Sequence, residues 1–499
     1  MATSAHVLLL ALFAFSCNGD ELPDTGDTDT DTDTDTDTDT DTDTDADTDT
    51  DTDRDTDTDT DTDTDTDTGD ASGELVASVL TSGLEDPFEV LAGPDGYLWV
   101  TERTAGRVTR VSTTDGSKVT AVTIADVMVT EGTQDGLLGM ALDPGLGSGS
   151  DYVYLAYTYD AAGVREAKIV RYSYDSGAHT LGSPLMLLEG LPGSTDHNSA
   201  RLLYGPDAKL YYTIGDQGHN QFDSKCLANH AQDLPTAQEV SASDWSQYQG
   251  KVLRLELDGS IPSDNPTLDG VRSHIYTYGH RNAQGLAFGP DGTLYESEHG
   301  PKTDDEVNIL VAGDNYGWPN VAGLQDDLAY VYGNWSAAPD CDSLEFSDLV
   351  IPASVPQAEE SEWSHPDFAP PENTFYAVPD DYDFEDPACD GLDYICWPTI
   401  APSSIAFYSG GPITGMDGML LISSLKLGTL YQIEVGTGAT ETVVYQSTDR
   451  FRRITVSADG STLYIATDNA GNVMGTDGSP TTTLTNPGAI LRLDWVTTE

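Results

Sequence analysis

The stretch Gly205-Pro-Asp-Ala-Lys-Leu-Tyr-Tyr-Thr-Ile-Gly-Asp216 joins a Gly-Pro-Asp turn to an apolar, β-branched run. Such a run directly after turn residues predicts a buried strand entered through a tight turn. The same phrase recurs at irregular intervals as GPDGYLWVTER (93–103), LDPGLGSGSDYVYLAY (142–157), GPDGTLYESEHG (289–300), GGPITGMDGMLLISSL (410–425) and SADGSTLYIATD (457–468). Six copies predict an all-β fold, a six-bladed β-propeller of four-stranded antiparallel sheets over residues 74–499.

Composition limits the classes of partner. The chain has 499 residues and an apolar fraction of 38%, which is enough for one large β domain. Residues 20–70 carry 25 acids and one Arg, a net charge of −24, so −41 of the total −65 belongs to the rest of the chain. An acidic body repels nucleic acid and anionic lipid and suits neutral substrates or bound cations. We therefore expect no nucleic-acid partner.

The N-terminus has the features of an export signal, over residues 1–17. An apolar run, Val7 to Phe15, is too short to span a bilayer and directly precedes Ser16-Cys17. The segment 14–17 is similar to a bacterial lipoprotein box, in which Cys17 would carry the lipid anchor. Ordinary cleavage after Ser16 is the alternative, because Phe15 is bulky and no Lys or Arg precedes the run. Both predict an exported bacterial protein, periplasmic or at the cell surface.

Residues 24–68 alternate Asp and Thr with almost no interruption. This pattern offers no apolar surface to bury, and its carboxylates repel one another, so we expect a disordered acidic linker over residues 18–73. Weak cation binding or glycosylation is the alternative role. A lipid anchor followed by such a linker would hold a folded enzyme away from a membrane surface.

Two residue pairs that each begin with Asp flank the predicted strand 210–214. They are Asp196-His197 before the strand and Asp216-Gln217 after it. A neutral imidazole held by a carboxylate is the usual general base near pH 7, and loops over a rigid sheet commonly carry the chemistry. The pattern therefore indicates an enzyme, although His197 alone could be a histidine satisfied within a turn.

This segment resembles the soluble quinoprotein glucose dehydrogenases, sugar dehydrogenases of the glucose/sorbosone dehydrogenase family that use pyrroloquinoline quinone (PQQ). The resemblance extends from about Leu75 to Trp495. It runs through GHRNAQGLAF (279–288), SEHGPKTDDEVNILVAGDNYGWPNVAG (297–323), YICWPTIAPSS (394–404) and DNAGNV (468–473). Runs of this length are highly specific.

The resemblance implies oxidation of an aldose at its anomeric carbon to the lactone. His197 would remove the proton from the anomeric hydroxyl while hydride leaves for the quinone, Asp216 would orient the imidazole, and Arg281 would stabilise charge on the reduced quinone. Electrons would pass to an external acceptor, a quinone, cytochrome or dye. A homodimer is typical of the family.

The resemblance also implies the binding residues. Those for the cofactor are Gln134, Asp196, Gln221, Phe222, Arg281, Asn282, Trp397, Thr399, Lys426, Arg450 and Arg452. Those for the sugar are Gln134, His197, Tyr394 and Trp397. From the residues alone, Arg450 and Arg452 would face the same way on an extended segment and could grip separate carboxylates of one anion, although a solvated strand fits equally well. Ala283 replaces the proline that the family has at that position.

Calcium is implied at two places. The carbonyls of Gly300 and Pro301 would hold a catalytic Ca²⁺, beside His299, which departs from the family pattern. Structural Ca²⁺ would be held within the acidic run 304–306 and beyond it, by Asp305, Glu306, Tyr316, Ala322, Leu324, Asp326 and Glu360. Leu324 replaces an aromatic residue, which a backbone carbonyl ligand would tolerate.

The family resemblance further implies a disulfide between Cys389 and Cys396, and the pairing of Cys226 with Cys341 stays open. Two other functions compete with the dehydrogenase. A metal-dependent lactonase on a similar propeller would need side-chain ligands converging on one ion, and would have no use for basic residues around a tricarboxylate. A non-catalytic sugar-binding propeller would not need the base, the basic cluster and the calcium loop together. Fold alone does not separate these functions.

Overall fold

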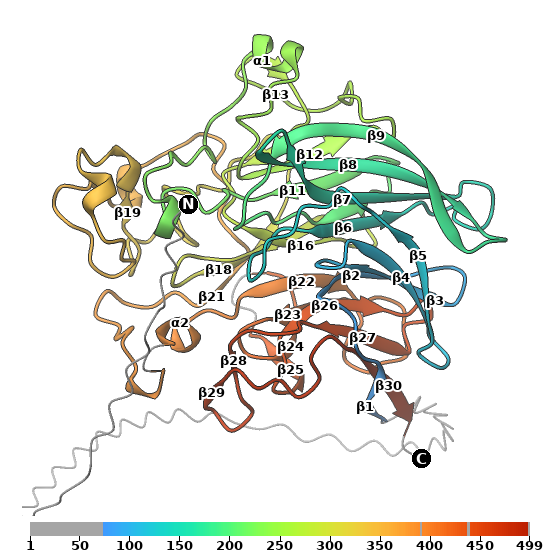
Figure 1. The fold of residues 1–499 in the computed structure, drawn as a ribbon. Coiled ribbons are helices and arrows are strands. Elements are labelled where there is room, and N and C mark those ends of the chain that lie inside the picture. The colour runs from blue at the N-terminus through green and yellow to red at the C-terminus, as the bar shows by residue number, and fades with distance from the viewer. Residues whose placement is uncertain (1–72, 390–391, 437–439, 498–499) are drawn as a thin grey trace, which may run out of the picture. The chain divides into compact units, whose positions relative to one another are not determined.

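The computed structural model describes residues 73–389, 392–436 and 440–497, which form six four-stranded antiparallel sheets (Figure 1). The predicted export signal, Cys17 and all but the last residue of the predicted linker lie outside the described residues. No helix within the described ranges is long and apolar enough to cross a membrane.

Five of the sheets use strands in chain order. They are β2 (Pro87–Ala92), β3 (Tyr97–Glu102), β4 (Arg107–Ser112) and β5 (Lys118–Thr123); β6 (Leu137–Leu142), β7 (Tyr152–Ala161), β8 (Val164–Asp175) and β9 (Thr180–Pro192); β10 (Leu202–Tyr204), β11 (Leu210–Ile214), β12 (Lys251–Leu255) and β15 (Ile275–Tyr278); β16 (Ala283–Phe288), β17 (Leu294–Glu298), β18 (Asp305–Ile309) and β21 (Asn373–Phe375); and β22 (Pro402–Phe407), β23 (Leu420–Ser424), β24 (Thr429–Ile433) and β25 (Thr442–Gln446).

The sixth sheet joins the two ends of the described chain. It consists of β26 (Phe451–Val456), β27 (Thr462–Thr467), β30 (Ile490–Thr497) and β1 (Gly73–Thr81). Antiparallel pairing runs from Gly73 opposite Thr497 to Thr81 opposite Ile490, and Figure 1 shows blue β1 beside red β30. The N-terminal strand thus closes the ring of blades, as propellers require.

Each repeated phrase forms the same part of a blade. The six copies supply the turn and the second strand, namely β3, β7, β11, β17, β23 and β27. The first strand of each blade packs beside the first strands of two neighbouring blades. The predicted six-bladed propeller of four-stranded antiparallel sheets is therefore confirmed.

The interior is apolar between blades and polar near the axis. Trp99 and Tyr174 pack edge to face in one inter-blade cluster, with ring centroids 4.9 Å apart. Near the axis, fully buried Arg201 pairs with Glu89 at 2.6 Å, and its guanidinium also donates to the carbonyls of Gln284 and Ser403. Arg201, which directly precedes β10, thus links its own blade to three others.

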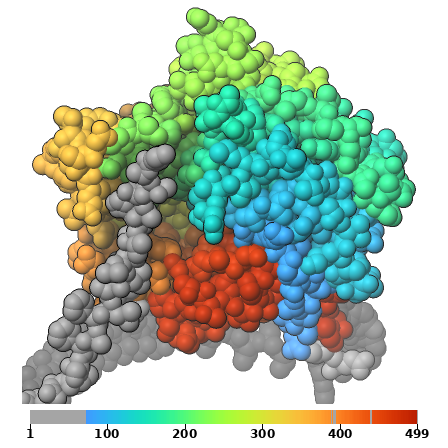
Figure 2. All heavy atoms as spheres, viewed as in Figure 1, coloured from blue at the N-terminus to red at the C-terminus, as the bar shows by residue number. Residues whose placement is uncertain are grey.

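The remaining elements are short and lie in the connections. They are η1 (Phe222–Ser224), α1 (Ala237–Ala242), β13 (Thr267–Leu268), β14 (Val271–Arg272), β19 (Tyr332–Gly333), η2 (Trp335–Ala337), η3 (Cys341–Ser343), β20 (Gln357–Ala358), η4 (Glu360–Glu362), η5 (Pro387–Cys389), α2 (Asp393–Cys396), β28 (Val473–Met474) and β29 (Pro480–Thr481). The segment around β19 forms a lobe at one side of the body (Figure 2). A disulfide between Cys226 and Cys341 ties this lobe to the loop after β11, and the predicted Cys389–Cys396 disulfide is confirmed.

Candidate functional site

The predicted catalytic and cofactor residues gather on loops at one end of the propeller. A first strand begins, and the second strand of the same blade ends, at the same end, because the two are antiparallel. His197, Arg281, Asn282, Trp397, Thr399 and Arg450 precede first strands, whereas Asp216, Gly300 and Lys426 follow second strands. The topology therefore brings together residues from four of the six blades.

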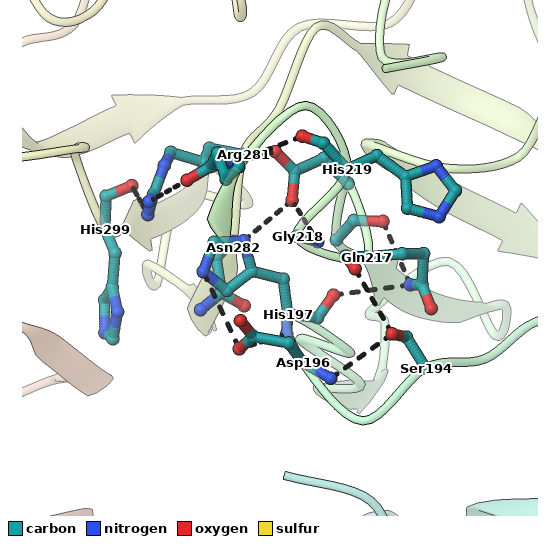
Figure 3. Close-up of polar contacts among 12 residues, drawn as sticks. Ser194, Asp196, His197, Gln217, Gly218, His219, Arg281, Asn282 and His299 are labelled. Atoms are coloured by element: carbon teal, nitrogen blue, oxygen red, sulfur yellow. Dashed lines mark hydrogen bonds and ion pairs between the residues drawn. The ribbon is translucent and has the colours of Figure 1, made fainter. Parts of the chain in front are cut away.

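His197 and Asp216 form a buried pair at this end (Figure 3). His197 Nδ1 lies 2.7 Å from Asp216 Oδ1, and Asp216 is fully buried. Burial alone would raise the pKa of Asp216, but the facing imidazole, the charge of Arg281 and the N–H of Gly218 hold that pKa below its usual value. An ionised carboxylate only accepts, so Nδ1 carries the proton and Nε2 presents its lone pair.

Several donors fix the Asp216 carboxylate in place. Oδ1 also accepts from the Gly218 N–H at 2.9 Å, while Oδ2 accepts from Trp318 Nε1 at 2.8 Å, Gln221 Nε2 at 3.1 Å and Asn229 Nδ2 at 3.1 Å. Five N–H groups thus hold the carboxylate that orients the imidazole, and they keep it charged without exposure to water.

The loop that carries His197 has a constrained backbone. His197, Ser199 and Ala200 adopt φ values of 40°, 52° and 62°, which are uncommon for residues with a side chain. Gly215 passes so close to this loop that a Cβ there would collide with the His197 carbonyl. Strained backbone held by its surroundings is frequent at functional sites, because it fixes side-chain direction.

Arg281 lies next to this pair. Its Nη2 donates to Gln221 Oε1 at 2.6 Å, and its Nη1 donates to the His299 carbonyl at 3.2 Å. Gln221 therefore bridges Arg281 and Asp216 through its two amide atoms. The guanidinium also lies 5.3 Å from the centroid of the Trp318 ring, and its buried Nε has no hydrogen-bond partner in the described part of the chain. The cation is held rigidly at the edge of the site.

Gln134, Asp196 and Asn282 complete this side of the site. The Gln134 amide donates to Asp196 Oδ1, which also accepts from the His197 N–H at 2.9 Å. Asn282 is buried, and its Oδ1 accepts from Ser199 Oγ at 3.1 Å. A small cavity beside the His197 loop is lined by Gln134, Asn198, Ser199, Gln284 and Arg452, among others.

Arg450 and Arg452 do face the same way, because both contact Asp468. Arg452 makes a bidentate pair with this carboxylate, with both N–O distances 2.8 Å, and Arg450 Nε lies 3.2 Å from Oδ2. Although burial opposes ionisation, the two arginines hold the pKa of Asp468 below its usual value. One carboxylate against two guanidiniums leaves a net positive charge available to an anion.

Lys426 brings the next predicted residues together. Its Nζ donates to the Trp397 carbonyl and to Thr399 Oγ1. Burial lowers the pKa of Lys426 to about 7, although Asp305 opposes this effect. Trp397 Nε1 is buried and has no partner within residues 73–389, 392–436 and 440–497. Lys426 is likewise paired with no carboxylate of these residues, and a buried ammonium of this kind suits an anionic ligand.

The outermost predicted residues lie nearer the surface. Tyr394, in α2, is 45% exposed, and its hydroxyl accepts from Asn472 Nδ2. Phe222 is 54% exposed and packs on Phe346 at a centroid distance of 4.8 Å. The structure therefore brings Tyr394 to the arginine side, because Arg450 donates to the Asn472 carbonyl, whereas Phe222 lies against the lobe.

His299 lies beside Arg281, as Figure 3 shows. Its Nε2 is buried and has no hydrogen-bond partner among the described residues. Burial, together with the charges of Arg281, His197 and Arg452, holds the pKa of His299 well below its usual value. His299 is therefore a neutral imidazole. Its Nε2 is one of several buried polar atoms at the site, with Arg281 Nε and Trp397 Nε1, that have no hydrogen-bond partner among the described residues. Such atoms fit a polar, planar ligand.

The predicted structural calcium ligands meet around the loop 322–327. Glu306 Oε1 accepts from the Gly323 N–H at 2.7 Å, and Glu360 Oε1 accepts from the Ala322 N–H at 2.9 Å. Burial raises the pKa of Asp304 to about 7 and of Glu360 to about 8, and that of Glu306 well above its usual value. Asp304 Oδ1 is buried without a partner. These acids fit a hard cation, which prefers oxygen ligands.

The side chains of the other predicted calcium ligands make contacts of different kinds. Asp305 accepts from three backbone N–H groups, those of Gly300, Ile400 and Ala401, and so ties two site loops together. Tyr316 donates its hydroxyl to the Ile309 carbonyl, and Leu324 is 43% exposed. For Tyr316 and Leu324, only backbone carbonyls would be left to bind a cation. The Asp326 carboxylate and that of Asp304 repel each other.

Sequence reasoning missed Trp318 as a donor to Asp216, and Asp468 as the common partner of the arginines. A signal for Asp468 was present. Two of the repeated phrases end on an acid one or two residues after the second strand, at Asp468 and Asp216. In two others the second strand itself ends on Glu102 or Glu298. All four acids are buried and contact Arg or His, since second strands end where the basic side chains gather.

Several known proteins are similar to this chain in sequence and in fold. The glucose / sorbosone dehydrogenase family model matches residues 84–342 and 380–475. Quinoprotein glucose dehydrogenase B of Acinetobacter calcoaceticus is 46% identical over 432 residues, covering 84% of this chain and 90% of that protein. The PQQ-bound aldose sugar dehydrogenase of Streptomyces coelicolor is similar in structure, with a TM-score of 0.58 and 26% identity over 85% of this chain and 99% of that one. The apo aldose sugar dehydrogenase of Escherichia coli, at 22% identity and a TM-score of 0.58 over 85% of this chain and all of its own, shares the fold. The chain therefore belongs to the glucose/sorbosone dehydrogenase family of oxidoreductases.

Proposed function

We propose that this enzyme is a PQQ- and Ca²⁺-dependent aldose 1-dehydrogenase, which oxidises the anomeric carbon of sugars such as D-glucose to the lactone. The observation that carries the proposal is a proton-accepting His197–Asp216 pair at the same end of the propeller as the basic cluster of Lys426, Arg450 and Arg452. Support also comes from the quinoprotein relative that is 46% identical.

His197 would act as the general base. Its Nε2 is free of hydrogen bonds within the described part of the chain and can accept the proton of the anomeric hydroxyl. As that O–H bond breaks, the C1–H bond gives up its hydrogen with both electrons, and the C1–O bond becomes the lactone carbonyl. Asp216 stabilises the imidazolium that forms, because its carboxylate lies 2.7 Å from Nδ1.

Arg281 and Asn282 would bind the acceptor side. When bound, PQQ supplies the electrophilic carbon that receives hydride, and Ca²⁺ on the carbonyls of Gly300 and Pro301 supplies Lewis-acid polarisation. The guanidinium of Arg281 is positioned by Gln221 and His299 to stabilise negative charge that develops there. Asp305 keeps the Gly300 loop in place by accepting its N–H at 2.8 Å.

Lys426, Arg450 and Arg452 would bind the carboxylates of this tricarboxylate, and Trp397 with Thr399 would line its plane. Gln134, Asp196 and Tyr394 would contact the sugar or its neighbouring cofactor, together with Gln221 and Phe222 at the other edge. The acids Asp304, Glu306, Asp326 and Glu360, with carbonyls of Tyr316, Ala322 and Leu324, would hold structural Ca²⁺.

For the remainder of the protein we propose an export signal over residues 1–17, lipidation at Cys17 and an acidic spacer over residues 18–73. This arrangement would place the propeller, residues 74–499, in the periplasm or at the cell surface. A homodimer and an external electron acceptor complete the proposal.

The experiment is reconstitution of the purified apoprotein with Ca²⁺ and PQQ, followed by dye reduction over a panel of aldoses. We expect activity that needs both additions. A parallel assay of lactone hydrolysis with Ca²⁺ alone addresses the competing function, and hydrolysis without any PQQ-dependent dye reduction would replace the dehydrogenase by the lactonase.

A further inference from the structure

A second group of buried metal-binding side chains lies on the same blade as the proposed calcium residues. His280, in the loop before β16, meets Glu296 and Glu298 of β17, and one ligand atom from each lies within 4.8 Å of the others. All three side chains are buried, with exposed fractions of 0%, 0% and 3%. None of them has a part in the mechanism proposed above.

The strand register explains why acids converge here. Glu296 stands opposite Asn308 and Glu298 stands opposite Glu306 on the neighbouring strand β18. Residues two apart on a strand share a face, as do directly opposed residues, so these four side chains project to one side of the sheet. The Asn308 amide donates to both Glu296 Oε2 and Glu306 Oε2, each at 3.0 Å.

Two oxygen atoms in this group lack partners. Glu296 Oε1 and Asn308 Oδ1 are buried and accept no hydrogen bond from any residue that the structure describes, and both side chains are 0% exposed. Buried polar atoms without partners are rare in native proteins and call for an unseen ligand such as an ion. Their position beside His280 and Glu298 indicates that the ligand lies within the cluster.

Glu296 and Glu298 also lack a direct ion pair with Lys or Arg in the described part of the chain, although the charge of Arg281 acts on Glu298. Their only ion-pair contact among these residues is between Glu298 and His280 Nδ1 at 3.4 Å. Buried Lys251, which acts electrostatically on His280, donates its three N–H bonds to the carbonyls of His230, Ala231 and Gln249. Carboxylates removed from water need a cation or a proton to offset the loss of hydration.

We propose that His280, Glu296 and Glu298 bind a divalent transition-metal ion of the zinc or manganese class, with Asn308 Oδ1 as a further ligand. A point among three atoms 4.8 Å apart lies within about 2.8 Å of each, so a small contraction reaches the ~2.0–2.2 Å of such bonds. A nitrogen ligand with carboxylates suits these ions, whereas Ca²⁺ takes oxygen ligands. The ion would also stabilise the Arg281 loop. His280 directly precedes Arg281 in the sequence, and the backbone N–H of Arg281 donates to Glu298 Oε2 at 2.6 Å.

The test is metal analysis of the purified full-length protein and its Glu296→Gln variant. Each is stripped with chelator, incubated with CaCl₂ and either ZnCl₂ or MnCl₂, freed of unbound metal by gel filtration and analysed by mass spectrometry. We expect the parent to keep one equivalent of transition metal and the variant to keep none, with equal calcium in both. Glutamine preserves size and can still accept from Asn308, so folding should be retained.

A matched control is Glu360→Gln, which should lower calcium and leave the transition metal unchanged. X-ray absorption of the zinc-loaded parent, which needs no variant, should show nitrogen and oxygen ligands and no sulfur. Absence of retained zinc and manganese in the parent, an unchanged content in Glu296→Gln, or a loss confined to calcium would each overturn the proposal. None of these measurements depends on PQQ or on activity.

Discussion

Replacement of Asp216 by Asn would test how the base is held. Asparagine keeps the size of the side chain but places an NH₂ group at one of two oxygen positions. At Oδ2 the amide would face three donors, those of Trp318, Gln221 and Asn229. At Oδ1 it would face two, His197 Nδ1 and the Gly218 N–H. The smaller conflict is at Oδ1, so we expect the NH₂ there.

This orientation changes the tautomer of the base. With a donor facing Nδ1, the imidazole must accept there and carry its proton on Nε2, where it can no longer accept the proton of the sugar. Loss of general-base catalysis typically lowers turnover by ~10²–10⁴-fold. Loss of a buried charge-assisted network should also lower the free energy of unfolding by ~2–3 kcal/mol.

The assay is dye reduction at saturating aldose after reconstitution with Ca²⁺ and PQQ, with cofactor binding followed separately by fluorescence titration. Binding should change little, because the carboxylates of PQQ would be held by Lys426, Arg450 and Arg452, for which the described structure shows no contact with Asp216. Of the proposed cofactor residues, Gln221 donates to Asp216 Oδ2, and asparagine keeps an acceptor at that position. Asn229→Ala is the matched control: it removes one donor to Oδ2 and leaves the contact with His197, so its loss should stay within about tenfold. Turnover of Asp216→Asn within about threefold of the parent would refute the reasoning.

The remaining predictions concern the base, the basic cluster and the calcium residues. His197→Ala should abolish turnover yet bind PQQ like the parent, and unchanged sugar oxidation would contradict its role. The double variant Arg450→Ala/Arg452→Ala should need at least ~10-fold more PQQ for reconstitution than the parent. The control Arg492→Ala removes an ion pair with Asp494 and should leave this concentration unchanged. Equal titration curves for the double variant and the parent would reject the anion site. Burial raises the pKa of Glu360 from 4.5 to about 8. The free energy of unfolding of the calcium-free protein should therefore fall by up to a few kcal/mol as pH rises from 4.5 through 8, and Ca²⁺ should suppress this loss. Melting temperatures measured with EDTA and with Ca²⁺ check both expectations.

The blades could be predicted from the sequence because their signal is local. A turn of Gly, Pro and Asp followed by an apolar run specifies a hairpin and its second strand without reference to distant residues, and all six runs form that strand. The closure of β1 with β30 could not be predicted in this way. It joins strands more than 400 residues apart in the sequence, and the pairing appears only once the ring forms.

The site was predictable as a set of residue types but not as a set of contacts. The pairing of His197 with Asp216 follows from their places at neighbouring strand ends. The bridging amide of Gln221, the donation by Trp318 and the shared partner Asp468 depend on how loops from different blades meet, which no local pattern encodes. Asp305 shows the same limit. Its place in an acidic run predicts a calcium ligand, but its carboxylate accepts hydrogen bonds from backbone N–H groups of a distant loop.

The most direct measurement is the rapid reduction of bound PQQ by glucose and by glucose deuterated at C1, followed by stopped-flow absorbance in the parent and in His197→Ala. We predict a clear isotope effect in the parent, because the C1–H bond breaks in the step that His197 assists, and a reduction rate lower by ~10²–10⁴-fold in the variant. Reduction of the bound quinone at the parental rate in His197→Ala would contradict the account.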